Sequence, residues 1–513
     1  MMTRNSTIDM TSNKGMVKNL IRFVAPLMLS GVLQLLFTAS DLIVCRYFGS
    51  EHSVGAIQST NALINLMVNL FMGLSIGANI LMSRCFGAND KERGQRVVYT
   101  AIILSVVLGV FIGVLGVTCS RYFLKWMGTN PDLIDLSTQY LTIYFIGIPF
   151  NMVYNYCSAL LRAIGDTKNP FYILTASGLF NVALNLILLT SKPELDVAGV
   201  AIATAASQFV AATAIFLYIY FKKGNFFTFR FKQMRFYKKE ALEITRLGLP
   251  AGIQGSLFSI SNVMIQTSVN ELSLNWGASL VDGNGAASSL EGFVYTAMNS
   301  CAQGIVTFGS ANYGAKNKAN IRRVILRAMM LVGISWAVPS VFLLIFHRDL
   351  LWIYVKSDTA VNFGAERLLI TISTYFLCGL MDVGAYSLRA IGYSVLPTVI
   401  STLGACGFRL IWVFAIFPIE YFHNLKWLAI SYPLSWALTA LTHAIFFIIL
   451  YKRLKFEDPP TDNTDDEKKD EMKTDGKEIP IECIDGENEV ELKEEITAIS
   501  VDSATTSTHA KEN

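Results

Sequence analysis

The sequence has little charge and few of the residues that build metal or redox centres. Only 16% of its 513 residues are charged and 52% are hydrophobic, with a mean hydropathy of +0.44. Eight cysteines and five histidines are scattered without CxxC or HxxxH spacing, which argues against a disulfide framework or a metal site. A soluble domain of this length would carry more polar surface. The composition therefore indicates an all-α polytopic membrane protein.

The two ends of the chain differ from its middle. Residues 1–17 lack the short apolar core and cleavage site of a signal peptide, so we interpret them as a soluble arm before the first insertion signal. From Phe456 onward lie 19 of the 39 acidic residues but only six of the 42 basic residues. With few aromatic residues, 452–513 is expected to be a disordered acidic tail, either a solvated extension or a segment that binds a regulatory partner.

Twelve apolar runs are each long enough to cross a bilayer as a helix, which takes roughly 20 residues. The helices are predicted near 18–46, 56–84, 97–119, 136–162, 170–190, 198–221, 245–274, 285–312, 322–346, 366–391, 395–418 and 427–451. We therefore predict a membrane protein with twelve transmembrane helices.

An internal repeat divides these helices into two sets of six. Three landmarks occur twice in the same order: LRAIG at 161–165 and 388–392, FGAND at 86–90 with NYGAKN at 312–317, and Pro26 with Pro250. A period this long indicates that each copy is a whole bundle rather than one unit of a solenoid. We predict an N-lobe at 18–221 and a C-lobe at 245–451, related as parallel repeats by an axis along the membrane normal.

Basic residues give the sidedness, because they gather in the loops that follow even-numbered helices. By the positive-inside rule, both termini are predicted to be cytoplasmic in a multi-pass protein of the cell membrane. The linker at 222–244 mixes bases with aromatic residues, which suits contact with an anionic leaflet of the lipid bilayer. Nucleic-acid binding by this linker is the less favoured interpretation, so no nucleic-acid partner is expected.

Polar side chains within the apolar helices of the N-lobe are candidate functional residues, since a charge at the bilayer centre costs about 2.5–3.5 kcal/mol. On the first helix, Gln34, Thr38 and Asp41 share one face. Other helices contribute the asparagines Asn61, Asn65, Asn155, Asn181 and Asn185. These residues are predicted to line a cavity around Asp41, or alternatively to join helices by hydrogen bonds.

The C-lobe has its own set of polar residues, which are Gln266, Glu291, Tyr295, Asp382 and Arg409. The register of the repeat makes Asp382 the equivalent of Asn155. Arg409 is expected to pair with Glu291 or Asp382, because an unpaired guanidinium in hydrocarbon is unfavourable. The three charges are interpreted either as a structural ion-pair network or as part of a substrate cavity. The LRAIG arginines, Arg162 and Arg389, are expected to extend to lipid headgroups.

Three segments resemble the multidrug and toxic compound extrusion (MATE) family: PLMLSGVLQLLFTASDLIVCRYFG from Pro26, GLSIGANILMSRCFGAND from Gly73, and LRAIGDTKNP from Leu161. The resemblance runs from about Ile21 to Lys452. It implies two bundles around a V-shaped central cavity that alternates between membrane faces, exporting amphipathic organic cations or drugs in exchange for H⁺ or Na⁺. It also implies that Asp41 is the coupling carboxylate, with Gln34 in the cavity and Asn181 beside it.

The chain departs from the family pattern in ways that favour H⁺ over Na⁺. Asn185 stands where related proteins often carry an aspartate, and Phe258 and Cys378 stand where the sodium-coupled branch is expected to carry acids. Loss of water around a carboxylate favours its protonated form, and a nearby cation favours its ionised form, so a proton and a cationic substrate would compete at Asp41. No cofactor is expected beyond the coupling ion, and a monomer would suffice.

Two other functions are weighed against antiport. A flippase for lipid-linked saccharides would share the two-bundle plan, but more arginines in the cavity would be expected than Arg409 supplies. A membrane-embedded enzyme would need a catalytic cluster, and the sequence has no paired DxxxD motif and no set of Ser, His and Asp near an interface. The sequence is therefore interpreted as a transporter of small organic molecules and not as an enzyme.

Overall fold

The computed structural model describes residues 8–50, 53–222, 226–355, 357–454 and 456. These residues belong to one unit, Met1–Pro459, whereas the second unit, Pro460–Asn513, lies outside the described residues together with most of the predicted acidic tail. All regular elements in the described ranges are helical, as the all-α class predicts.

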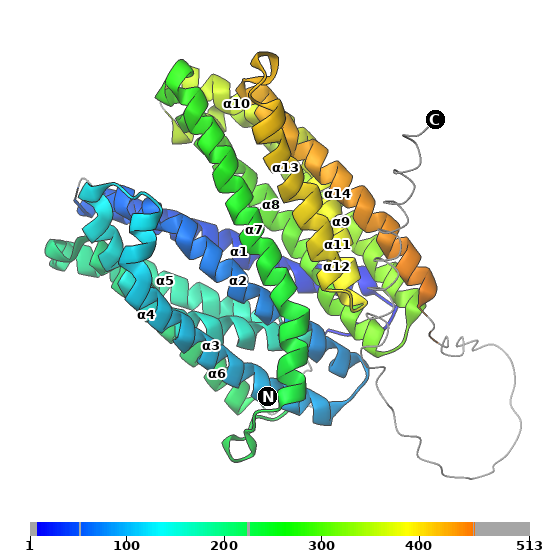
Figure 1. The fold of residues 1–513 in the computed structure, drawn as a ribbon. Coiled ribbons are helices and arrows are strands. Elements are labelled where there is room, and N and C mark those ends of the chain that lie inside the picture. The colour runs from blue at the N-terminus through cyan, green and yellow to red at the C-terminus, as the bar shows by residue number, and fades with distance from the viewer. Residues whose placement is uncertain (1–7, 51–52, 223–225, 356, 455, 457–513) are drawn as a thin grey trace, which may run out of the picture. The chain divides into compact units, whose positions relative to one another are not determined.

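The N-terminal half contains six long helices (Figure 1). They are α1 (Met16–Phe48), α2 (Ser53–Gly87), α3 (Lys91–Trp126), α4 (Pro131–Ala163), α5 (Lys168–Ser191) and α6 (Asp196–Phe221), with the short 3₁₀ helix η1 (Pro193–Leu195) before α6. Local chemistry sets several of their starts. The side chain of Asn130 accepts a hydrogen bond from the Asp132 N–H at the start of α4, where Pro131 is the first helical residue.

The C-terminal half also contains six long helical segments, and two of them are built from more than one helix. It contains η2 (Phe231–Gln233), α7 (Lys238–Trp276), α8 (Ala278–Gly314), α9 (Lys318–Tyr354), α10 (Asp358–Thr374), α11 (Phe376–Ala390), α12 (Val395–Ser401), η3 (Thr402–Gly407), α13 (Phe408–Ile411), η4 (Trp412–Ile416), η5 (Glu420–Phe422) and α14 (Leu425–Arg453). α10 and α11 are bent by 46° at Tyr375. η3 and η4 are π-helical turns that flank α13 within one apolar segment.

The repeated LRAIG segments are helix ends of the same kind. Gly165 N–H donates to the Arg162 carbonyl and Asp166 N–H donates to the Leu161 carbonyl, and Gly392 and Tyr393 repeat this pair of bonds in the other half. This pattern is a Schellman motif, which requires a left-handed residue after the helix. Both glycines meet that requirement, with φ of 84° and 109°.

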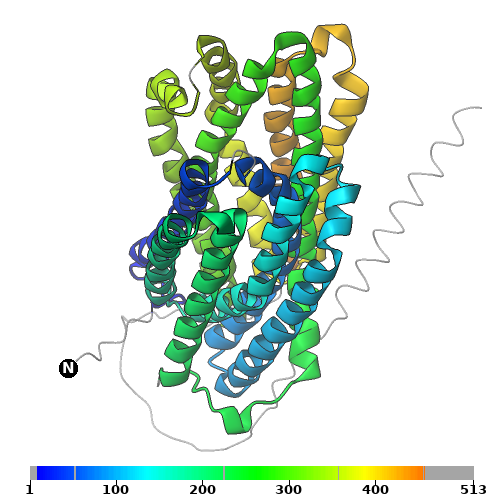
Figure 2. The same cartoon turned by 90° about the vertical axis from the view of Figure 1, so that its left-hand side faces the viewer.

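The second pair of repeated segments, 86–90 and 312–317, forms the same kind of connection between two helices in each half. Asn89 and Lys316 have φ of 54° and 55°, and the next residues, Asp90 and Asn317, cap α3 and α9 with their side chains. Because equivalent positions adopt equivalent backbone geometry, the predicted repeat of two six-helix bundles is confirmed. Figures 1 and 2 show α1–α6 gathered in one bundle and α7–α14 in the other.

The two halves meet along α2 and α7. A Cβ atom on Gly73 would lie 2.0 Å from the Gly252 nitrogen, so the two backbones touch there without side chains between them. The ends of α2 and α8 also meet, since a Cβ atom on Gly87 would overlap the Ala311 carbonyl. This second contact lies at the LRAIG end of the bundle, which we define as the end that carries Gly165 and Gly392.

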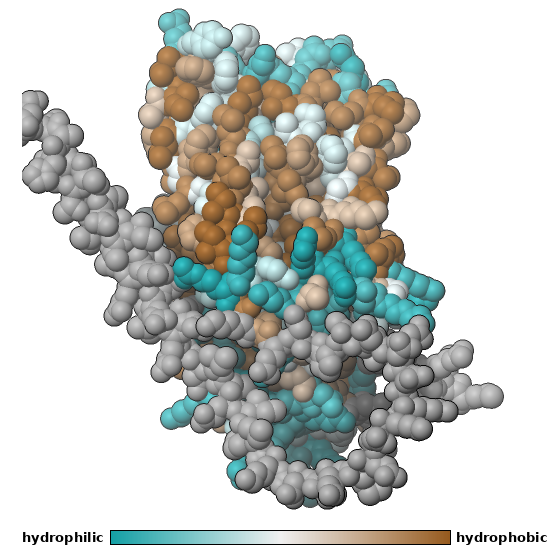
Figure 3. All heavy atoms as spheres, turned by 90° about the vertical axis from the view of Figure 1, so that its right-hand side faces the viewer, coloured by the Kyte–Doolittle hydropathy of each residue, from teal (hydrophilic) through white to brown (hydrophobic). Residues whose placement is uncertain are grey.

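Apolar surface supports a membrane location. Among the described residues, eight helices are long and apolar enough to cross a bilayer, and the bent pair α10 and α11 makes a ninth crossing. α4, α7 and α8 fall outside this set, and they carry many of the polar residues discussed below. Figure 3 shows a broad band of hydrophobic side chains with hydrophilic side chains above and below it.

The predicted helix positions agree with the structure, but several starts lie earlier. α3 begins at Lys91 rather than near 97, α10 at Asp358 rather than near 366, and α7 at Lys238. The first turns of α7 therefore fall within the predicted linker 222–244. The preceding residues pack on the N-lobe, where the Phe229 ring lies 5.5 Å from that of Tyr99. Contact between the predicted linker 222–244 and a lipid leaflet stays a prediction.

Candidate functional site

Asp41 lies at the centre of a polar cluster formed by α1, α5 and α6. Its Oδ1 atom accepts a 2.6 Å hydrogen bond from Asn185 Nδ2. Asn185 Nδ2 is also 3.5 Å from Asn181 Oδ1, and Asn181 Nδ2 is 3.5 Å from Thr204 Oγ1. The structure thus brings together three of the four residues predicted to couple cation movement, and it adds Thr204, which sequence reasoning missed.

The Asp41 carboxylate has neutral neighbours. No lysine, arginine or histidine forms an ion pair with Asp41 within the part of the chain that the structure describes, and the amide of Asn185 donates a hydrogen bond to it. Asn185 Oδ1 is buried without a hydrogen-bond partner among the described residues. Such a carboxylate can change its protonation state or take a cationic partner without first breaking a salt bridge.

The other predicted N-lobe residues lie apart from this hydrogen-bond cluster. Asn155 donates to the carbonyl and side-chain oxygens of Asn151 within α4, rather than to Asp41. Gln34, Thr38 and Asn65 are exposed although they lie within apolar helices, and Asn61 is half-buried. Thr38 donates to the Gln34 carbonyl one turn earlier. Exposed amides in the middle of α1 and α2 are suited to contact a substrate.

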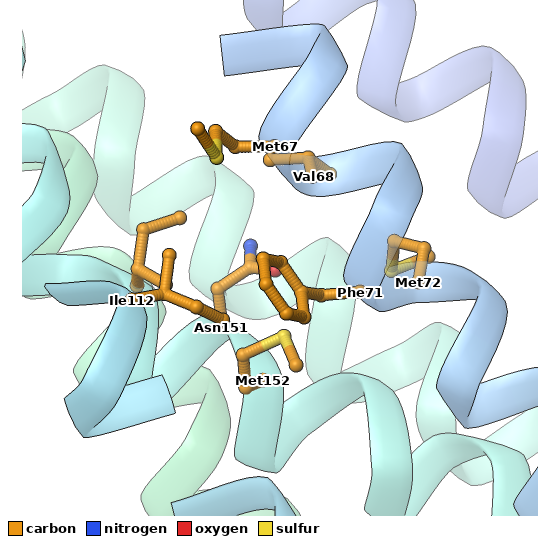
Figure 4. A pocket seen from close by; sticks show the side chains of 8 residues that line it. Met67, Val68, Phe71, Met72, Ile112, Asn151 and Met152 are labelled. Atoms are coloured by element: carbon orange, nitrogen blue, oxygen red, sulfur yellow. The ribbon is translucent and has the colours of Figure 1, made fainter. Parts of the chain in front are cut away.

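A small cavity between α2, α3 and α4 is apolar and does not include Asp41. It has a volume of about 10 Å³, which is room for about one water molecule. Its lining residues are Met67, Val68, Phe71, Met72, Ile112, Ile148, Asn151 and Met152. Figure 4 shows Phe71 directed toward Asn151 and Met152. Methionine and phenylalanine make this wall adaptable in shape.

A larger cavity of about 300 Å³ lies within the C-lobe. It is lined by Asn262, Ile265, Gln266, Ser288, Glu291, Gly292, Tyr295, Arg367, Tyr375 and Tyr432. This volume is at the lower end of the range for small-molecule sites. Three of the predicted cavity residues, Gln266, Glu291 and Tyr295, are therefore found together at one cavity, whereas Asp382 and Arg409 do not line it.

Glu291 pairs with Arg367, and the expected pairing with Arg409 is wrong. Arg367 Nε and Nη2 donate to the two Glu291 oxygens at 3.0 and 2.9 Å, and Thr371 Oγ1 donates to Oε1 at 2.6 Å. Arg367 Nη1 also donates to Asn284, which in turn donates to Gln266. The sequence predicts a helix start near 366, which would place Arg367 at a helix end rather than within the membrane. In the structure α10 begins at Asp358, so Arg367 lies well inside the helix.

Arg409 has neutral partners only among the described residues. Its Nε donates to Ser435 Oγ at 3.1 Å, and its Nη1 lies 3.5 Å from Asn262 Oδ1. The guanidinium lies over the Tyr432 ring, 4.3 Å from its centroid, and near Trp436. Arg409 is on α13, the short helix between two π-helical turns, a feature often found at functional sites.

Asp382 belongs to a separate cluster on α8 and α11. Asn299 Nδ2 lies 2.9 Å from Asp382 Oδ2 and close to the hydroxyls of Tyr295 and Tyr386. Asp382 does not pair with Arg409, so this part of the sequence-based expectation is also wrong. Asp382 and its repeat equivalent Asn155 are both 8% exposed, so the same position is buried in each half.

Arg389 does not extend to headgroups as expected. It is 3% exposed, and its Nη2 donates to Gln254 Oε1 on α7 at 2.6 Å. Within the described residues, no group of three or more His, Cys, Asp or Glu side chains could hold a metal ion.

Two helical bundles joined by close backbone contact, with buried carboxylates and a cavity between helices, are the architecture of a multi-pass membrane transporter. The MatE family model matches residues 26–187 and again residues 250–414, so one model fits both halves. The chain belongs to this family of multidrug and toxic compound extrusion transporters.

Curated relatives and solved structures agree with this assignment. The chain is 28% identical over 441 residues to the probable multidrug resistance protein YoeA of Bacillus subtilis, covering 84% of this chain and 93% of that protein. It is 23% identical to the multidrug export protein MepA of Staphylococcus saprophyticus, covering 75% of this chain and 84% of that protein. An outward-facing multidrug resistance MATE family transporter of the MOP superfamily has the same fold, with a TM-score of 0.79 at 18% identity, over 88% of this chain and 99% of that one.

Proposed function

We propose that the protein is a secondary antiporter that exports amphipathic organic cations or drugs in exchange for H⁺, with Asp41 as the coupling carboxylate. The observation that carries this proposal is the environment of Asp41, a carboxylate held by the amide of Asn185 with no ion-pair partner among the described residues. The names of the relatives, a probable multidrug resistance protein and a multidrug export protein, support drugs as the substrate class.

The proposed cycle follows from competition at one carboxylate. With Asp41 ionised, the N-lobe attracts a cationic substrate; with Asp41 protonated, that attraction is lost and the substrate leaves. Exchange results if the two membrane-facing states differ in their affinity for proton and substrate. Asn185, Asn181 and Thr204 orient the carboxylate through their linked hydrogen bonds. We favour H⁺ over Na⁺, because Phe258 and Cys378 stand where the sodium-coupled branch of the family is expected to carry acids.

The experiment uses purified protein in proteoliposomes with a fluorescent organic cation. A pH gradient is imposed in one set and a Na⁺ gradient in another. We expect the pH gradient to drive dye movement and Asp41→Asn to reduce the rate by at least about tenfold, the effect of losing a group that acts in the coupled step. Asp135→Asn, a substitution on an exposed surface residue, is the matched control. Movement at the normal rate in Asp41→Asn would exclude this role for Asp41.

The remaining features of the proposal concern location and assembly. We propose a cell-membrane protein with both termini in the cytoplasm, which acts as a monomer without a cofactor. The basic LRAIG end of the bundle, with Arg84, Arg93 and Arg96 near it, supports the cytoplasmic placement of that end. Dye movement driven by a Na⁺ gradient alone would show that Na⁺, and not H⁺, is the coupling ion. Failure of both gradients would turn attention to lipid-linked saccharides as substrates.

A further inference from the structure

The cavity in the C-lobe has an unequal balance of charge. Glu291 is its one lining carboxylate, and both of its oxygens are occupied by Arg367 and Thr371. The Glu291 charge is therefore neutralised, and its capacity to accept hydrogen bonds from a ligand is largely used. A cationic ligand would have to compete with a buried guanidinium that binds through two parallel hydrogen bonds.

A second guanidinium lies directly behind the cavity wall. Arg409 is 3% exposed and contacts Asn262 and Tyr432, which both line the cavity. No acidic side chain forms an ion pair with Arg409 in the described ranges. Glu291 is balanced by Arg367, and the next carboxylate, Asp382, is held by Asn299 rather than by Arg409. Arg409 is therefore left without an ion-pair partner among the described residues. A buried charge without a counter-ion is costly, and an anion in the cavity would reduce this cost.

The groups that face the cavity are mainly hydrogen-bond donors. A guanidinium can only donate, so Asn262 presents its oxygen to Arg409 and keeps its Nδ2 group for the cavity. Asn262 is an exposed residue, and its Nδ2 group donates no hydrogen bond to the described residues. The Tyr295 hydroxyl accepts from Asn299, which also donates to Asp382, so the Tyr295 proton can be donated toward that carboxylate or toward the cavity. Ser288 adds another exposed hydroxyl.

We propose that the C-lobe cavity binds the carboxylate of an amphipathic substrate, held by the donors of Asn262, Ser288 and Tyr295 in the field of Arg409. The rings of Tyr375 and Tyr432 supply apolar surface for the body of such a molecule. This inference rests on the proposed export of amphipathic molecules and assigns the part of the C-lobe that would hold the carboxylate of such a molecule. Asp41 in the N-lobe then attracts the cationic group of a substrate, and Arg409 in the C-lobe attracts a carboxylate.

The test compares two forms of one dye. A rhodamine with a free carboxylate is a zwitterion, and its ethyl ester is a cation of nearly the same size and shape. Their affinities for the purified protein are measured by fluorescence polarisation, and the ratio of the two affinities is the readout. Arg409→Gln removes the charge and keeps donors. It is expected to lower the ratio of zwitterion to ester affinity by about tenfold, the effect of losing one partly screened charge interaction.

Two further variants keep the test decisive. Arg409→Lys retains the positive charge and should keep most of the preference for the zwitterion. Asn262→Leu removes the donor at the cavity wall and should lower the same ratio, which covers the case in which Arg409→Gln does not fold. Equal loss of affinity for both dyes in these variants, or no change in the ratio, would overturn the proposal. Because binding is measured without a gradient, failure of H⁺-driven transport would refute the proposed function separately.

Discussion

Gly165 shows how one backbone angle decides where a helix stops. Its φ of 84° is in the left-handed region, and a Cβ atom at this position would lie 3.0 Å from the backbone nitrogen of Ile8. Gly165→Ala is expected to lower the stability of the folded protein by about 1–2 kcal/mol, the usual cost of this conformation for an L-residue. The measurement is the apparent melting temperature in detergent.

Gly285→Ala is the matched control for this change. Gly285 is inside α8, and nothing lies within 4 Å of a Cβ atom built on it. Alanine is favoured over glycine in a helix by up to about 1 kcal/mol, so the melting temperature should stay the same or rise. A loss in the control as large as in Gly165→Ala would show that the left-handed backbone of Gly165 is not the cause of the effect.

The candidate site was partly predictable from helical spacing. Spacing alone places Asn181 and Asn185 on one face of α5, and the structure brings that face to Asp41. Thr204 could not be found in this way, because a single threonine in an apolar helix is common and its partner is on another helix. Arg367 was missed for a different reason, since its importance depends on where α10 begins.

At the scale of elements, the joint between α4 and α5 is held by Asp166. Its carboxylate accepts hydrogen bonds from Lys222 Nζ at 2.6 Å and from the Tyr218 hydroxyl at 2.8 Å, both at the end of α6. Burial raises the pKa of Asp166, but the Lys222 ammonium and the hydrogen bonds outweigh it and hold the pKa below its usual value. The contribution to stability is therefore complete above the unfolded pKa of about 3.9.

Asp166→Asn should thus destabilise the protein at neutral pH by about 1–3 kcal/mol, since the hydrogen bonds to a charged group are lost. The difference from the unchanged protein should shrink as the pH falls through the folded pKa of Asp166, where the carboxylate becomes protonated. Melting curves at pH 7 and at successively lower pH test this. Asp135→Asn, which removes an exposed ion pair with Arg121, should change little at any pH. A pH-independent effect of Asp166→Asn would contradict the electrostatic explanation.

The elements themselves were more predictable than their irregularities. Apolar runs of about 20 residues and the LRAIG repeat predict twelve crossings and two bundles, because membrane helices must satisfy their own backbone hydrogen bonds. The bend at Tyr375 and the π-helical turns around α13 have no such sequence signal. They depend on packing against neighbouring helices, such as the contact of Arg409 with Tyr432 and Ser435 on α14.

At the scale of the whole transporter unit, the LRAIG end is closed by contacts between the halves. Thr307 Oγ1 on α8 donates to Asn79 Oδ1 on α2 at 3.0 Å, and the Arg84 guanidinium lies over the Tyr313 ring. The described part of the N-terminal arm joins them. Met10 is 1% exposed, and its carbonyl accepts from Asn312 at the end of α8, while Ile8 contacts Gly165 of the other half.

The alternating access that we propose would require these contacts to separate, so the arm should stabilise the state that is closed at this end. Met10→Ser removes a buried side chain that is expected to be worth about 1.5–3 kcal/mol, and a loss of 1.4 kcal/mol changes an equilibrium roughly tenfold. We therefore expect Thr307→Cys, in a background without the eight native cysteines, to react with a maleimide roughly tenfold faster when Met10→Ser is added. Thr11→Ala, whose hydroxyl contacts Asp9 alone among the described residues, should leave the rate unchanged. Equal maleimide reaction rates in all three proteins would mean that the arm contacts this end without stabilising its closed state. The contacts between α2 and α8 would then be sufficient to keep this end closed.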